Sequence, residues 1–147
     1  MPAIPSTIDG VNVVFAPNVN NDVTPKMVAA LRAVISTGIA PGHVLHTIYV
    51  SSARRKQPTA SNHPYGRAVD VSRINGIRID PGFTNDASVR AIVMAIQTAF
   101  ESAPNRRENY GPAFLKKSGA LLKTTNPSAY ARLEPMHRNH IHMSVNT

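Results

Sequence analysis

Alternation of hydrophobic and polar positions predicts several strands. Strands are expected over residues 11–15, 46–52 and 68–74, which are rich in β-branched side chains. Asn75 and Gly76 form a dipeptide typical of a two-residue hairpin turn, after which residues 77–79 return as a strand. Apart from the strand at 11–15, residues 1–23 are expected to form an extended arm.

A helical period of apolar residues predicts two helices. Thr24 and Pro25 are typical of an N-cap followed by the first helical residue, and we expect Gly38 to end this helix. Asp86 is expected to cap a second helix that runs to about Phe100. The apolar stripe of the first helix contains Met27, Val28, Leu31, Val34 and Ile35, and that of the second contains Val89, Ile92, Val93, Ile96 and Phe100. Prolines divide residues 102–133 into short helical or looped pieces.

The end of the chain, residues 140–145, alternates with a period of two. His140, His142 and Ser144 fall on one face of the predicted strand, and the other face carries Ile141, Met143 and Val145. With His137, the local pattern is HxxHxH. We therefore expect an α+β fold: one domain over residues 1–147, with a small, mostly antiparallel sheet and helices packed on one side.

Charge and composition narrow the classes of partner. The 147 residues carry a net charge of +8 with pI ≈ 10.5, which favours anionic partners such as nucleic acid, anionic lipid surfaces or acidic cell-wall polymers, without choosing among them. Aromatic residues make up only 5% and no nucleic-acid motif is visible, so no specific nucleic acid is expected. We find no transmembrane segment and no secretory signal. The absence of cysteine excludes thiolate metal ligands.

The stretch SNHPYGRAVD, residues 61–70, contains a histidine and an aspartate seven residues apart. Asp70 should face away from the core, because Val69 and Val71 alternate with it. Gly66 allows the backbone to fold back and bring His63 towards Asp70. With His142 they offer two nitrogens and one oxygen. Three protein ligands with one open position are typical of a catalytic zinc site, here on the open face of the sheet. The plain alternative is two ends of a surface loop.

These residues match the pattern SxHxxGxAxD at Ser61, His63, Gly66, Ala68 and Asp70. Together with the terminal HxH they resemble the LAS group of zinc peptidases, which includes D-Ala-D-Ala carboxypeptidases, lysostaphin-type endopeptidases and the hedgehog signalling domain. The HxxHxH ending is most similar to the zinc D-Ala-D-Ala carboxypeptidases and murein endopeptidases. Another subgroup has a carboxylate where this chain has Asn139, which argues against that subgroup. The resemblance covers residues 50–72 and 134–145.

The resemblance implies a role for each site residue. One Zn²⁺ ion would be bound by His63, Asp70 and His142. His140 would act as general base or transition-state stabiliser, with His137 assisting. VSSARRK is loosely similar to the family's upstream arginine motif and aligns Arg54 with the substrate-binding arginine, and Arg55 is a close competitor.

The resemblance also implies a function: zinc-dependent hydrolysis of peptide bonds in peptidoglycan stem peptides or crosslinks. The short chain, with no wall-binding domain and no export signal, resembles a one-domain phage endolysin, which we expect to be a monomer. Such an enzyme would stay in the host bacterial cytoplasm until its release to the periplasm. Which bond is cut, and whether as endopeptidase or carboxypeptidase, stays open. A virion-associated enzyme or a bacterial cytoplasmic peptidase would have the same sequence features. The alternative functions are a metal-containing binding module of the same fold and a basic nucleic-acid-binding domain.

Other polar and aromatic residues have plainer interpretations. His43 and His46 flank a turn and a strand start, and we expect them to be solvent-facing or structural. Glu134 is a candidate to orient one of the histidines. Tyr65 and Tyr110 either line the cleft or simply pack against the rest of the fold.

Overall fold

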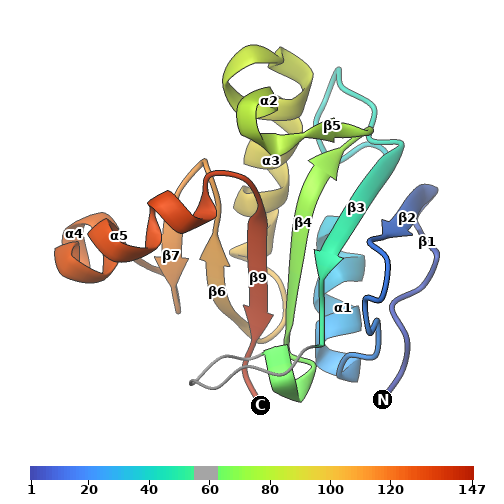
Figure 1. Ribbon diagram of the computed structural model, residues 1–147, viewed down its shortest axis with the longest axis horizontal. Helices are drawn as coiled ribbons and strands as arrows, with labels where there is room; N and C mark the ends of the chain where they lie inside the picture. Colours follow the sequence, from blue (N-terminus) through green and yellow to red (C-terminus); the bar gives the residue numbers. More distant parts are fainter. Residues whose placement is uncertain (55–62) are drawn as a thin grey trace.

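The computed structural model describes residues 1–54 and 63–147 and has the expected α+β architecture (Figure 1). Its strands are β1 (Thr7–Ile8), β2 (Val11–Phe15), β3 (Thr47–Ser52), β4 (Ala68–Ile74), β5 (Ile77–Arg78), β6 (Arg106–Tyr110), β7 (Leu115–Lys117), β8 (Ala120–Leu121) and β9 (Ile141–Val145). Its helices are α1 (Pro25–Val34), α2 (Ile79–Asn85), α3 (Ala87–Phe100), α4 (Leu122–Thr125) and α5 (Pro127–Leu133), with 3₁₀ turns η1 (His63–Tyr65) and η2 (Pro135–His137).

The strands of the described residues form one nine-stranded sheet in the order β1-β2-β3-β4-β9-β6-β7-β8, with β5 paired to β4. Only the β2–β3 pair within it is parallel, so the sheet is mostly antiparallel as expected. It is larger than the small sheet that we predicted. The N-terminal segment contributes the short strand β1 in addition to the predicted β2. The strands at residues 11–15, 46–52, 68–74 and 140–145 are confirmed to within one residue.

Helices α1 and α3 pack on the same face of the sheet, where they cover the central strands β4 and β9. Both N-terminal caps are confirmed: Thr24 Oγ1 accepts a hydrogen bond from Met27 N, and Asp86 Oδ1 accepts one from Val89 N. Gly38 does not end α1. The helix ends at Val34, because Ile35 turns into an extended conformation and buries its side chain in the core.

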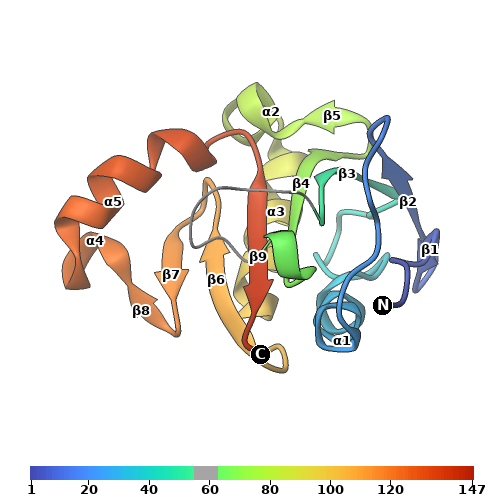
Figure 2. The same ribbon diagram turned by 60° about the horizontal axis from the view of Figure 1, so that its bottom comes forward.

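Residues 102–133 contain three strands that the sequence did not predict as such. The β6 segment lacks hydrophobic alternation because it carries polar side chains on both faces. On the core side, Asn109 is fully buried and donates hydrogen bonds to Gln97 O and Glu101 Oε2 of the α3 region. Helices α4 and α5 follow and lie at the β7–β8 end of the sheet, away from α1 (Figure 2).

A β-bulge interrupts the pairing of β4 with β3. Val50 pairs with Val71 and Tyr49 with Arg73, which leaves Ser72 as an extra residue on β4. The predicted turn at Asn75 and Gly76 is confirmed, with positive φ angles of 52° and 79°. The returning strand ends at Arg78, and Ile79 already begins α2.

None of the helices in the described ranges is long and apolar enough to cross a membrane.

Candidate metal centre

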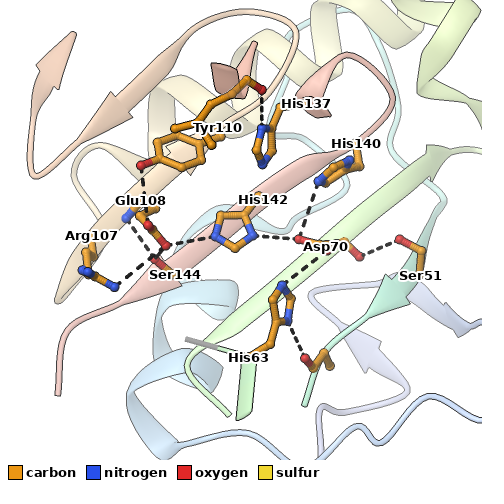
Figure 3. A network of polar contacts seen from close by, with 12 residues as sticks. Ser51, His63, Asp70, Arg107, Glu108, Tyr110, His137, His140, His142 and Ser144 are labelled. Carbon is orange, nitrogen blue, oxygen red and sulfur yellow. Dashed lines mark hydrogen bonds and ion pairs between the residues drawn. The ribbon is translucent and has the colours of Figure 1, made fainter. Parts of the chain in front are cut away.

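Asp70 and His142 are cross-strand partners on β4 and β9, the two central strands of the sheet. The residues that alternate with them, including Val71 and Ile141, are fully buried against the helices. Asp70 and His142 therefore share the opposite face, as the alternation predicted, and Figure 3 shows their side chains meeting there. Asp70 Oδ1 lies 2.8 Å from His142 Nδ1.

His63 reaches the same place from the turn η1, which immediately precedes β4. Its ring is buried, and its Nε2 lies 3.4 Å from Asp70 Oδ2. Gly66 makes this approach possible because its φ of +68° is in the left-handed region. A Cβ at Gly66 would lie 3.1 Å from Val23 Cα, so a side chain there would also meet backbone. The chain therefore folds back over the sheet as expected.

His63, Asp70 and His142 form a buried cluster that can hold a metal ion, with one ligand atom from each within 4.8 Å of the others. The hydrogen-bond partners of the two rings determine which nitrogen faces the cluster. His63 Nδ1 lies 2.5 Å from the carbonyl oxygen of Ala53, and His142 Nε2 lies 3.1 Å from Glu108 Oε1. Both partners are acceptors, so these two nitrogens carry the hydrogens.

The remaining nitrogens, His63 Nε2 and His142 Nδ1, face the carboxylate of Asp70. In the neutral tautomers both would present lone pairs to an acceptor. Only a cation between them, or protons on the rings, makes that arrangement favourable. Two imidazole nitrogens and one carboxylate oxygen also match the ligand types that zinc uses in catalytic sites. The donor set thus fits a divalent metal ion.

The same contacts shift the pKa values of Asp70 and His142. Burial opposes the charged form of Asp70, but hydrogen bonds from His142 and His63 outweigh it and hold the pKa of Asp70 well below its usual range. Burial likewise opposes the charged form of His142, but hydrogen bonds to Asp70 and Glu108 raise its pKa to about 9. Without a metal, a proton on His142 takes the place of the cation.

Glu108 is a site residue that the sequence analysis missed. It lies on β6, and its carboxylate accepts hydrogen bonds from His142 Nε2 at 3.1 Å and from Ser144 Oγ at 2.8 Å. Burial opposes its charged form, but the bond from His142 lowers its pKa to about 2. No motif marks this residue, since β6 lacks the alternation of a recognisable strand. A carboxylate bonded to the outer nitrogen of a ligating histidine fixes its tautomer.

His140 and His137 lie beside the cluster, as predicted. His140 Nδ1 donates to Asn139 Oδ1 at 2.7 Å, and its Nε2 lies 3.9 Å from Asp70 Oδ1. His137 Nδ1 donates to the carbonyl oxygen of Leu133 at 2.6 Å. The two rings are 4.9 Å apart, and burial lowers the pKa of His137. His140 keeps 19% of its side chain exposed, so solvent or a substrate can reach it.

Tyr110 lies on the same face of the sheet as Asp70 and His142. The sequence had left open whether its ring lines the cleft or simply packs, and the structure places the ring against two of the site histidines. Its ring stacks on His142 with centroids 5.6 Å apart and meets His137 edge-on at 5.1 Å. Tyr65, in contrast, is largely exposed, with the guanidinium of Arg67 over its ring.

The other described candidate residues interact with partners outside the cluster of His63, Asp70 and His142. Arg54 is exposed, and its Nε donates to the carbonyl oxygen of Pro64, next to His63, at 3.4 Å. Its competitor Arg55 and the motif residue Ser61 lie outside the described residues. Glu134 forms a bidentate ion pair with Arg138, with distances of 2.8 and 2.7 Å, so its carboxylate is engaged away from the histidines.

His43 and His46 lie apart from the cluster of His63, Asp70 and His142. Within the described residues they join no group of metal ligands.

A scan against protein-family models, a search of curated proteins and a search of solved structures found no match to this chain.

Proposed function

We propose that the protein is a zinc metallopeptidase that hydrolyses peptide bonds in bacterial peptidoglycan. The observation that carries the proposal is the direction of the two imidazole lone pairs. His63 Nε2 and His142 Nδ1 both face the carboxylate of Asp70, while their other nitrogens are committed to Ala53 and Glu108. The match of residues 61–70 and 137–142 to the LAS-type pattern supports the same conclusion.

The proposed ligands of the ion are His63, Asp70 and His142. Three protein ligands suit a catalytic zinc, which lowers the pKa of water at its open position to about 7 and polarises a carbonyl group. Glu108 would hold His142 in the tautomer that leaves Nδ1 for the metal.

His140 is the proposed general base. Because its Nδ1 donates to Asn139, its Nε2 is the nitrogen that can accept a proton from the attacking water. The same nitrogen can then return that proton to the leaving amine, so that the histidine ends the cycle as it began. Burial lowers the pKa of His137, which favours its neutral form, and its ring lies 4.9 Å from that of His140, where it is proposed to assist. The exposed Arg54 is the proposed contact for a substrate carbonyl or carboxylate.

The substrate class and the setting come from the resemblance and the charge. Stem peptides of peptidoglycan carry several carboxylates, and a net charge of +8 favours association with such an anionic polymer. A phage endolysin, held in the host cytoplasm until its release to the periplasm, is the proposed role.

The test is digestion of purified Gram-negative peptidoglycan, with and without a zinc chelator, followed by mass spectrometry of the soluble fragments. We expect fragments that disappear with chelator and return with zinc, and their new termini identify the bond. Protein that contains stoichiometric zinc but releases nothing would instead be a metal-containing binding module.

A further inference from the structure

A hollow of about 390 Å³ lies beside the metal centre and plays no part in the proposed chemistry so far. It is lined by Ser72, Arg73, Arg78, Asp80 and Asn139. Asn139 connects the two sites, since its Oδ1 accepts the hydrogen bond from His140 Nδ1. The β4–β5 hairpin and the loop before β9 lie at the same end of the sheet (Figure 1), and both contribute residues to the lining. Its volume is in the range of small-ligand sites.

The β-bulge in β4 places Arg73 on this face. In regular alternation, Arg73 would share the core side with Val71. The extra residue Ser72 shifts the alternation, so that Val71 and Ile74 are both fully buried while Ser72 and Arg73 stay half-buried and line the hollow. The bulge therefore directs a guanidinium towards the same open face as Asp70.

Two arginines face each other across the hairpin. Arg73 pairs directly with Arg78, an arrangement of like charges that costs stability unless an anion lies near. In the described part of the chain, neither arginine has a carboxylate within ion-pair distance. Asp80 is the single acidic residue of the lining, so the lining keeps one net positive charge.

The guanidinium of Arg73 also lies over an aromatic ring. Its Cζ lies 4.3 Å from the centroid of the Tyr49 ring. Stacking on an aromatic face leaves the N–H edge of a guanidinium available for planar, bidentate bonds to a carboxylate. Ser72 and Asn139 add neutral hydrogen-bonding groups at the same hollow.

We propose that this hollow, the Arg73–Arg78 hollow, binds one carboxylate of the peptide substrate and so determines which peptides reach the metal centre. One net positive charge suits a monoanion better than a phosphate dianion. The inference rests on the proposed function, because the substrate is the stem peptide of that proposal, and it adds a specificity site next to the general base.

The test uses synthetic stem peptides, L-Ala-γ-D-Glu-diaminopimelate-D-Ala, each with one carboxylate replaced by a carboxamide. We expect one of these replacements to lower kcat/KM of the wild-type protein by roughly tenfold or more, as for a lost charged hydrogen bond. Arg78→Gln and Arg73→Gln should lose most of that preference. Arg73→Lys should keep only part of the preference for the carboxylate, because lysine keeps the positive charge but cannot make the planar, bidentate hydrogen bonds of a guanidinium. Arg32→Gln, on the exposed side of α1, is the charge-matched control and should keep the full preference.

Binding of the same peptides to zinc-loaded His140→Ala protein, with and without Arg78→Gln, is measured by calorimetry. If the wild-type protein cleaves but both arginine variants keep the full preference for the carboxylate, the inference is wrong. If no peptide is cleaved but the carboxylate preference appears in binding and depends on Arg78, the hollow is confirmed and the peptidase proposal fails. Absence of both cleavage and preferential binding overturns both.

Discussion

Asp70 Oδ1 on β4 lies 2.8 Å from His142 Nδ1 on β9, although the two residues are 72 positions apart in the sequence. They meet because they are directly opposite in the antiparallel register, where side chains on one face are about 5 Å apart at Cβ. The sheet therefore brings together two members of the candidate metal centre, and His63 joins them from the turn before β4.

Replacing a proposed ligand should strongly weaken metal binding. For His142→Ala and Asp70→Asn we expect at least a hundredfold loss of zinc affinity, since the first removes one of three protein donors and the second replaces a charged carboxylate with a neutral amide. Competition with a chromophoric chelator measures it. The matched control is His43→Ala, which lies outside the cluster and should bind zinc like the wild-type protein. Equal affinity in His142→Ala would mean that the metal lies elsewhere.

Glu108 should affect zinc affinity without being a metal ligand itself. Glu108→Ala removes the acceptor for His142 Nε2, and such changes typically weaken metal affinity 10- to 100-fold. Glu108→Gln keeps an acceptor and should lose less. Glu134→Gln, which changes only the exposed pair with Arg138, serves as control. Zinc affinity and the absorption spectrum of the cobalt-substituted protein are the readouts, and unchanged values in Glu108→Ala would make Glu108 a structural residue only.

Replacing His140 should lower turnover without lowering the zinc content of the protein. His140→Ala keeps all three proposed ligands, so zinc content should stay near one per chain, whereas kcat should fall by roughly 10²- to 10⁴-fold. Metal analysis and kcat on the same preparation provide the comparison. Full activity in this variant would remove His140 from the mechanism.

The metal-free protein should lose stability as the pH rises. The pKa of His142 is raised from 6.5 to about 9 by Asp70 and Glu108, so its contribution is complete below pH 6.5 and disappears as the pH passes 9. The difference is on the order of 3 kcal/mol at most. Denaturant unfolding of chelator-treated protein between pH 6 and 10 measures this slope.

His142→Ala is the control for that measurement, because it lacks the titrating group. Its unfolding free energy should depend less on pH across the same range. Identical pH profiles of the two proteins would show that His142 does not carry the effect.

A side chain at position 66 should destabilise the fold and weaken zinc binding. Gly66→Ala meets both a positive φ and the backbone of Val23, so we expect a loss of roughly 2–4 kcal/mol in unfolding free energy and weaker zinc binding through His63. Gly42 has a similar φ of +83° but open space around it. Gly42→Ala should therefore cost only about 1 kcal/mol and leave zinc affinity unchanged. Equal effects of the two variants on zinc affinity would contradict the proposed role of Gly66.

The amino-acid sequence alone was enough to predict the central strands and the face of the sheet on which Asp70 and His142 lie. Alternation in residues 68–74 and 140–145 is sufficient, because a period of two assigns Asp70 and His142 to the polar face once Val71 and Ile141 are assigned to the core. The helix caps at Thr24 and Asp86 are equally local, since each depends on a hydrogen bond three residues away.

The site role of Glu108 and the orientation of Arg73 could not be predicted from the sequence, because both depend on partners distant in sequence. Glu108 lies in a strand whose core side is satisfied by a polar contact between Asn109 and α3, so its segment shows no alternation. The bulge at Ser72 that turns Arg73 to the open face depends on register with β3. Local patterns report which face a residue prefers, whereas the pairing of strands determines which residues meet on that face.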